Sequence, residues 1–352
     1  MKKRETVKAL VKFSFDDDGI ELRDVAEPVV TPDTVIVATR VVGVCGSDIH
    51  LWRNAHSWEV DVPVVIGHEI AGVVTEVGSH VDGWQVGDRV VCETASRICG
   101  TCSYCRRGQY NICPKRLGYG AKRDGFFTER VGVEPRILHR IPDNVPDEHA
   151  AMVEPFAVAF NALVERGTVR PGDHVVVQGA GAIGALSVQV AKLQGAASVT
   201  LLCTSADAER IAPVLAMGAD RAVVVDEEDP AIVIAGLGDG QGADVVVDAT
   251  GVSAALEKSL ELVRPLGSIV KVGWGPQPLN ISLDPLVAKA VTLYGSFSHN
   301  WGTWERVLDL FALGRLDAAR ALGGVYRLTD WKRAFEDMES GRNIKSVITF
   351  NE

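Results

Sequence analysis

Four cysteines lie close together in the first half of the chain, at the spacing C-x2-C-x2-C-x7-C: Cys99, Cys102, Cys105 and Cys113. Thiolates bind zinc as a tetrahedral set, and two-residue gaps let neighbouring sulfurs reach one ion at about 2.3 Å. The alternatives are a disulfide pair or an accidental cluster. The spacing predicts a structural zinc lobe at about residues 97–115. Because four protein ligands leave no position for a substrate, we expect the chemistry to occur elsewhere.

A second set of possible metal ligands lies outside this lobe. Its members are Cys45, His68, Glu69 and Glu154. A catalytic zinc takes three protein ligands and keeps a fourth position for water or substrate, and cysteine, histidine and glutamate are chemically suitable. Each residue alone is unremarkable, because buried cysteines, hydrogen-bonded histidines and solvated glutamates are common.

A glycine-rich segment in the middle of the chain fits the pattern G-x-G-x-x-G: Gly179, Ala180, Gly181, Ala182, Ile183 and Gly184. The pattern alone is weak, because plain turns also show it. Here an apolar stretch at 174–178 precedes it and an apolar helical run at 183–193 follows. That context predicts a dinucleotide whose pyrophosphate lies at a helix N-terminus.

The choice between NAD and NADP depends on the end of the next strand, where an acidic residue would bind the ribose hydroxyl of NAD. Thr204 and Ser205 are neutral there, and Arg210 follows nearby. A 2′-phosphate is therefore permitted, and the sequence favours NADP. The competing interpretation makes Asp207 the ribose ligand, unless Asp207 only interacts with a helix dipole.

The composition is that of a globular protein. The 352 residues suffice for two domains, and hydrophobic and charged residues make up 47% and 23%. The net charge of −10 opposes nucleic-acid binding, although residues 97–122 are locally basic.

No targeting segment is apparent. The charged N-terminus is not followed by a long apolar segment, and the longest uncharged run, 175–191, is broken by three glycines. We expect neither secretion nor a membrane span, and the need for reduced thiolates favours the cytoplasm.

Two patterns divide the chain. Up to about residue 150, short valine-rich runs such as 34–44, 71–77 and 88–91 alternate with Gly, Pro and Asp, which predicts a β-rich lobe. From residue 173, apolar strands alternate with helical stretches, which predicts an α/β fold with a doubly wound parallel sheet. The expected strands and helices of this second part are 174–178, 183–195, 199–203, 209–217, 222–225, 245–249, 268–272 and 291–294. The tail contains an amphipathic stretch at 304–313 and an apolar strand at 346–350 that we expect to return to the first lobe.

The order of these motifs resembles the zinc-dependent medium-chain alcohol dehydrogenases. Gly67-His68-Glu69, continuing to Gly72, Gly78 and Val81, is similar to their G-H-E-x2-G-x5-G-x2-V signature. Cys45-Gly46-Ser47-Asp48 precedes it, and the four cysteines, Glu154-Pro155 and the glycine segment follow in the family's order. The resemblance spans the whole chain and is strongest to the sorbitol and threonine dehydrogenases.

The resemblance implies a GroES-like catalytic domain (1–155), a Rossmann NAD(P)-binding domain (156–297) and a C-terminal segment (298–352) that completes the first domain. It implies a catalytic zinc on Cys45, His68 and either Glu69 or Glu154, with Asp48 orienting the His68 ring. It also implies that Ser47 and His50 relay the alcohol proton to solvent while hydride passes to the nicotinamide.

The substrate class implied is a polyol, sugar or sugar acid oxidised at a secondary alcohol. Segments 52–58 and 296–301 mix aromatic rings with hydrogen-bonding groups, which suits such a substrate, although core or subunit contacts would also explain the tryptophans. A threonine-type 3-hydroxy amino acid or a general secondary alcohol is the alternative, but we find no cation for the amino acid's carboxylate. The resemblance further suggests a homodimer or homotetramer. A zinc-binding interaction module or a zinc-free reductase would leave part of the motif set unexplained.

Overall fold

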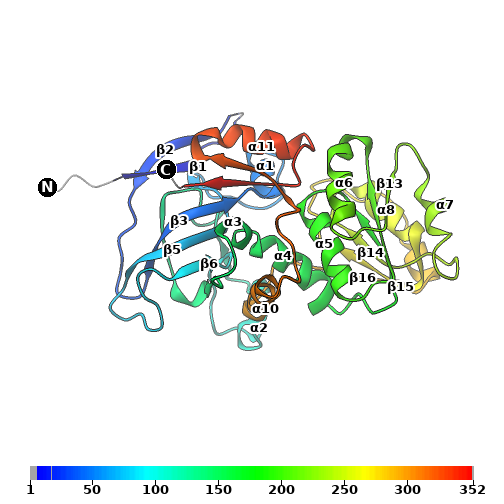
Figure 1. The fold of residues 1–352 in the computed structure, drawn as a ribbon, viewed down its shortest axis with the longest axis horizontal. Coiled ribbons are helices and arrows are strands. Elements are labelled where there is room, and N and C mark those ends of the chain that lie inside the picture. Colours follow the sequence, from blue (N-terminus) through cyan, green and yellow to red (C-terminus); the bar gives the residue numbers. More distant parts are fainter. Residues whose placement is uncertain (1–5, 17, 351–352) are drawn as a thin grey trace.

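The computed structural model describes residues 6–16 and 18–350, which form two lobes side by side (Figure 1). In the first lobe, strands pair in the order β10-β6-β5-β3-β18-β17, and β9 also pairs with β3. Their bounds are β3 (Val35–Gly43), β5 (Glu69–Val77), β6 (Arg89–Cys92), β9 (Arg130–Val133), β10 (Leu138–Arg140), β17 (Leu322–Arg327) and β18 (Lys345–Thr349). A smaller sheet, β2-β1-β4, consists of β1 (Thr6–Lys12), β2 (Ile20–Ala26) and β4 (Val64–Val65).

Short helices and strands connect these sheets, and the predicted metal ligands lie in or beside several of them. They are α1 (Gly46–Trp52), β7 (Ala95–Arg97), α2 (Ser103–Arg106), β8 (Leu117–Gly118), α3 (Asp147–Ala150) and α4 (Val153–Phe160). Two of them, β7 and β8, pair at the base of the four-cysteine segment. The valine-rich runs of the sequence thus form strands because alternate side chains fill the core of the lobe.

The second lobe holds a parallel sheet in the order β13-β12-β11-β14-β15-β16, with helices between the strands. Its strands are β11 (His174–Gln178), β12 (Ser198–Cys203), β13 (Arg221–Val224), β14 (Ala243–Asp248), β15 (Val263–Lys271) and β16 (Thr292–Gly295), and its helices are α5 (Ala182–Leu193), α6 (Ala208–Ala216), α7 (Pro230–Ile234), α8 (Ser253–Leu262) and α9 (Asp284–Ala288). The predicted fold class, a GroES-like lobe with a Rossmann sheet, is confirmed.

The last part of the chain returns to the first lobe. After α10 (Trp301–Ala312) and β17, helix α11 (Trp331–Glu339) leads to β18, which pairs antiparallel with β3 through Val347 and Gly43. The sequence indicated β18 but neither β17 nor α11. An edge strand containing Gly323 and Gly324 and a helix rich in charged residues carry a weak apolar signal.

One core cluster joins the two lobes. It runs from Val41 and Ala71 of the first sheet through Phe156 on α4 and Phe311 on α10 to Val177 on β11. Buried apolar contact of this kind fixes the lobes against each other, so the residues facing the space between them have defined positions. No helix among the described residues combines the length and the apolar character needed to span a bilayer.

Candidate active site and zinc lobe

Three possible metal ligands converge where α1 meets β5. Cys45 immediately precedes α1, His68 immediately precedes β5, and Glu69 is the first residue of β5. One donor atom from each residue lies within 4.8 Å of the others. A thiolate, an imidazole and a carboxylate at this separation form a donor set that suits zinc, so the residues fit the metal that the sequence predicts.

Asp48 lies behind the His68 ring. Its Oδ2 accepts a hydrogen bond from the Cys45 amide at 2.9 Å, and its Oδ1 lies 3.9 Å from His68 Nδ1. The carboxylate is 1% exposed, and Oδ1 has no hydrogen-bond partner among the described residues. Burial raises the pKa of Asp48, although the charge of His68 opposes that shift. Asp48 therefore faces a nitrogen of the His68 ring, at a separation longer than a hydrogen bond.

Glu69 forms an ion pair that the sequence did not reveal. Lys345, the first residue of β18, places Nζ 2.6 Å from Glu69 Oε1, and both side chains are completely buried. Burial raises the pKa of Glu69, and Glu69 raises the pKa of Lys345 against the effect of burial. Gly43 provides the space, since a Cβ there would lie 1.9 Å from Glu69 Oε2.

Glu154 is held differently. It lies in the first turn of α4, is 6% exposed, and its Oε1 is 2.9 Å from His299 Nε2. His299 in turn accepts a hydrogen bond on Nδ1 from the Trp304 indole at 2.5 Å. Burial acts to raise the pKa of Glu154, but the hydrogen bond and charge of His299 outweigh it and the pKa falls. His299 was not identified as a functional residue from the sequence, although the segment 296–301 was.

The two residues of the expected proton relay lie on α1. Ser47 and His50 are three residues apart, which places them on the same side of a helix. His50 is half-buried, which lowers its pKa, and its ring lies 6.3 Å from the ring of Trp58.

The four cysteines of the lobe also converge. Their sulfurs lie within 4.8 Å of one another. The Sγ atoms of Cys99 and Cys105 are 3.9 Å apart and those of Cys99 and Cys113 are 3.6 Å apart, too far for disulfide bonds. Amide groups point at these sulfurs, and hydrogen bonds from Cys102 and Thr101 lower the pKa of Cys99 to about 5. The geometry fits four thiolates around one zinc ion.

The glycine segment forms the turn between β11 and α5. Gly179 has a φ of 99°, and a Cβ at Gly184 would lie 1.8 Å from the Gly179 carbonyl oxygen. A Cβ at Gly181 would meet nothing within 4 Å, so this side of the turn is open, and Ala182 and Ile183 begin α5. The open turn before a helix N-terminus fits a pyrophosphate.

The residues expected to choose the cofactor make internal contacts. The Ser205 amide donates to Asp226 Oδ1 at 2.9 Å, and the Ser205 hydroxyl also bonds to that carboxylate. Thr204 donates its hydroxyl to Asp207 at 3.1 Å. Arg210 bonds to Asp207 at 3.1 Å and to the Asn343 carbonyl at 2.7 Å. The structure thus places a carboxylate beside Ser205 and directs the Arg210 guanidinium toward the C-terminal segment.

Aromatic residues from both lobes form a row that ends at His50 on α1, the helix that follows Cys45. The ring of Trp58 lies 5.8 Å from that of Trp274, which lies 5.9 Å from that of Phe297. Trp274 follows β15 and is 51% exposed, and it was not anticipated. Trp52 belongs to segment 52–58, which the sequence offered for the substrate. It proves instead to be a core residue packed on Trp331, because it occupies the buried side of α1.

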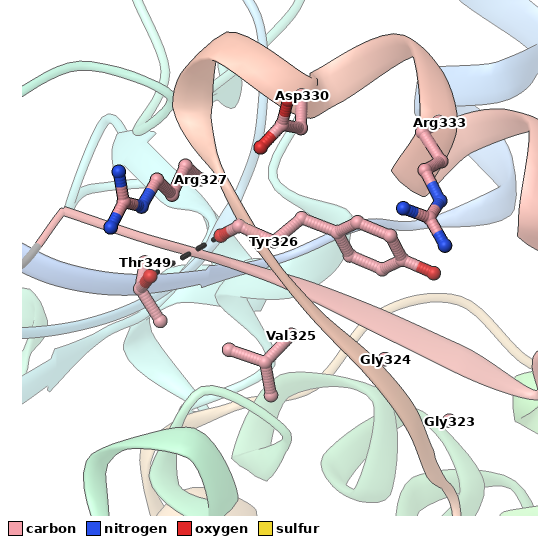
Figure 2. Close-up of a pocket in the computed structure, with 8 residues that line it drawn as sticks. All are labelled: Gly323, Gly324, Val325, Tyr326, Arg327, Asp330, Arg333 and Thr349. Carbon is pink, nitrogen blue, oxygen red and sulfur yellow. Dashed lines mark hydrogen bonds between the residues drawn. The ribbon is translucent and has the colours of Figure 1, made fainter.

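A separate hollow lies along the edge strand β17 (Figure 2). Tyr326, Arg327, Asp330, Arg333 and Thr349 surround it. It contains none of the predicted site residues, so the site described above does not depend on it.

Comparison with known proteins adds family matches over both lobes. The pattern of the "Alcohol dehydrogenase GroES-like domain" matches residues 31–143, and that of "Zinc-binding dehydrogenase" matches residues 182–312. The sorbitol dehydrogenase of Halalkalibacterium halodurans is 36% identical over 344 residues, which cover 97% of this chain and 99% of that protein. The D-arabitol-phosphate dehydrogenase of Enterococcus avium is 34% identical, with coverage of 99% and 98%. The L-threonine 3-dehydrogenase of Pyrococcus furiosus is also 34% identical, with coverage of 94% and 95%.

Solved structures agree in fold over nearly the full length. A zinc-binding dehydrogenase from Sinorhizobium meliloti 1021 bound to NADP superposes with a TM-score of 0.89 at 29% identity, covering 98% of this chain and 99% of that one. An alcohol dehydrogenase from E. coli CFT073 complexed with NADH gives a TM-score of 0.89 at 26% identity, with the same coverage.

Proposed function

The chain belongs to the zinc-dependent medium-chain alcohol dehydrogenase family, and we propose that it transfers hydride between a secondary alcohol of a polyol, sugar or sugar acid and NAD(P). The observation that carries this proposal is the donor set of Cys45, His68 and Glu69, together with the aromatic row that both lobes contribute and that reaches His50 on α1. Aromatic faces bind the C–H surfaces of a polyol, and neighbouring polar groups bind its hydroxyls. The sorbitol and arabitol-phosphate dehydrogenases among the relatives support this class.

Cys45, His68 and Glu69 would hold the catalytic zinc. We select Glu69 over Glu154 because a Glu69 oxygen lies within 4.8 Å of the donor atoms of Cys45 and His68. When bound, zinc supplies a Lewis acid that stabilises negative charge on the substrate oxygen. Asp48 would hold the His68 ring in position.

Ser47 and His50 would carry the alcohol proton to solvent. Replacing Ser47 by alanine should lower kcat about 100-fold or more, because a general base path is lost. Zinc content, measured by mass spectrometry of the metal, should stay at the wild-type value. Ser79→Ala, at an exposed serine in the turn after β5, is the matched control. Unchanged turnover in Ser47→Ala would remove this residue from the mechanism.

The cofactor preference concerns Thr204, Ser205 and Arg210. Neutral Thr204 and Ser205 permit a 2′-phosphate, and on this basis we propose NADP in preference to NAD. Asp226, bonded to the Ser205 hydroxyl, and the internal contacts of Arg210 act against that preference. A kcat/KM at least tenfold higher with NAD than with NADP would contradict it.

The experiment that tests the function is a substrate panel with both cofactors. Polyols, sugars, sugar acids and 3-hydroxy amino acids are supplied to the zinc-loaded protein, and the absorbance of the reduced nicotinamide is followed. We expect two zinc ions per chain and the highest kcat/KM on a polyhydroxylated substrate. Preference for threonine would support the alternative that the Pyrococcus furiosus relative suggests. Protein with two zinc ions and no dehydrogenase activity on any alcohol would refute the proposal.

We also propose the domain organisation, the cellular compartment and the oligomeric state of the enzyme. Residues 1–155 and 298–352 would act as the catalytic unit and 156–297 as the cofactor unit. The seven cysteines are all free, which suits a reducing compartment such as the cytoplasm. A homodimer or homotetramer is proposed, supported by the edge strand β16, on which Leu293 is exposed.

A further inference from the structure

We infer that Arg116 binds an anionic group of the substrate, a carboxylate or a phosphate monoester, at the end of the carbon chain away from the reacting carbon. This inference deepens the proposed function and rests on it. It adds a charge requirement to the substrate class.

Arg116 is a half-buried cation with one buried donor that no described residue accepts. It follows Cys113 by three residues, and its Nη2 donates to Thr94 Oγ1 at 2.8 Å. Its Nε is buried and has no hydrogen-bond partner among the described residues. A guanidinium carries five N–H donors, and a buried polar group without a partner is costly. Such a group indicates a ligand that completes its hydrogen bonds.

The nearby carboxylates do not neutralise Arg116 directly. Glu93 accepts hydrogen bonds from the Tyr110 hydroxyl at 2.8 Å, and Glu154 is bound to His299. Both act on Arg116 only through their charge, and burial still lowers the pKa of Arg116. Within the described part of the chain, the guanidinium therefore has no carboxylate in contact.

The backbone leaves room for this side chain at Gly118. A Cβ at Gly118 would lie 3.3 Å from Arg116 Nη1, tighter than most contacts of that kind. Glycine at this position therefore lets the guanidinium lie close against the backbone.

Arg116 lies at one end of the aromatic row. Its guanidinium carbon is 5.3 Å from the centre of the Phe297 ring, and Phe297 continues through Trp274 and Trp58 toward His50. Two residues beyond Phe297, His299 contacts Glu154 next to the metal ligands. A substrate bound at the ligands and extending past Glu154 to Phe297 would place its other end near Arg116.

The four-cysteine lobe holds this arrangement in place. Asn111, inside the lobe, donates its side-chain amide to the Phe297 carbonyl at 2.7 Å, and its own amide donates to Asn300 Oδ1 at 3.0 Å. The lobe thus ties the segment that carries Phe297 to the segment that carries Arg116.

A planar guanidinium binds carboxylates and phosphates with paired hydrogen bonds, so the shared chemistry is an oxyanion on a polyhydroxylated chain. The test compares D-sorbitol, D-gluconate and D-sorbitol 6-phosphate, with ribitol, ribonate and ribitol 5-phosphate as a second backbone. The variants are Arg116→Met, Arg116→Lys and, as control, Lys115→Met at the exposed neighbouring cation. The preferred anion identifies whether the source is a carboxylate or a phosphate.

We expect wild-type kcat/KM to be at least tenfold higher on one anionic substrate than on the neutral alditol of the same backbone. Arg116→Met should lower that efficiency about 10- to 100-fold, mainly through KM, because charge-assisted hydrogen bonds are lost. Efficiency on the neutral alditol should change less than threefold, Arg116→Lys should recover part of the loss, and Lys115→Met should match wild type. Inorganic phosphate or acetate should compete with the neutral alcohol in wild type and not in Arg116→Met.

Two results would overturn the inference while leaving the proposed function intact. One is a wild-type preference for the neutral alditols. The other is an Arg116→Met variant that loses efficiency equally on neutral and anionic substrates, as a purely structural arginine would. Absence of activity on every alcohol with both cofactors would instead refute the proposed function, and the inference with it.

Discussion

Replacing Cys45 by serine should lower kcat/KM about 1000-fold or more. The variant should still fold and should still bind zinc at its four-cysteine lobe. Cys45 supplies the single thiolate among the three converging donors, and a serine hydroxyl is a poor zinc ligand near neutral pH. Loss of the metal removes the charge that stabilises the substrate oxygen, which contributes several kcal/mol to the barrier. Metal analysis should show a fall from two zinc ions per chain to one.

Two other cysteines provide the controls for Cys45→Ser. Cys203, buried on β12 and outside both clusters, should tolerate alanine with two zinc ions and near-normal activity. Cys113→Ala should remove the other zinc ion and loosen the lobe. A Cys45→Ser variant that retains two zinc ions and full turnover would show that the reaction does not use this site.

Replacing Lys345 by methionine should destabilise the protein by about 3–5 kcal/mol, because Glu69 is left as a buried carboxylate without its partner. Both side chains are completely buried, so in the variant water cannot solvate the Glu69 carboxylate in place of the lost ion pair. The measurement is the free energy of unfolding in urea at neutral pH after the catalytic zinc has been removed, so that no metal charge replaces that of Lys345. Activity should also fall, because Lys345 fixes the carboxylate that would bind the catalytic zinc.

The double variant Glu69→Gln with Lys345→Met separates stability from catalysis. Removing both charges should recover most of the stability, but not the activity, because a metal ligand is still missing. Lys258→Met, which breaks an exposed ion pair with Glu261, should change stability by no more than about 0.5 kcal/mol. A Lys345→Met variant as stable as wild type would show that the pair does not hold β18 to β5.

The convergence of the four cysteines and the glycine turn between β11 and α5 were predictable because the residues of each are close in sequence. Two-residue gaps bring sulfurs together whatever the rest of the chain does, and the glycine turn is built from one strand, one turn and one helix. The alternation of strands and helices after residue 173 likewise predicted the parallel sheet, since each element forms from its own apolar pattern.

Contacts between distant segments were not predictable from the sequence. Glu69 meets Lys345 across 276 positions, and Glu154 meets His299 across 145. Both contacts depend on sheet pairing and lobe packing, which a local pattern does not encode. For the same reason the sequence left Glu69 and Glu154 unranked, whereas in the structure a Glu69 oxygen lies with the donor atoms of Cys45 and His68.

The four cysteines show most directly which features the sequence determines and which only the tertiary structure decides. The sequence by itself determined a thiolate site without a position for substrate, because ligand type and spacing suffice for that conclusion. Only the tertiary structure decided what the lobe positions, namely Phe297 and Arg116 at the end of the aromatic row. The physical reason is that the spacing fixes the metal ligands locally, while the lobe's neighbours are chosen by how the whole chain packs.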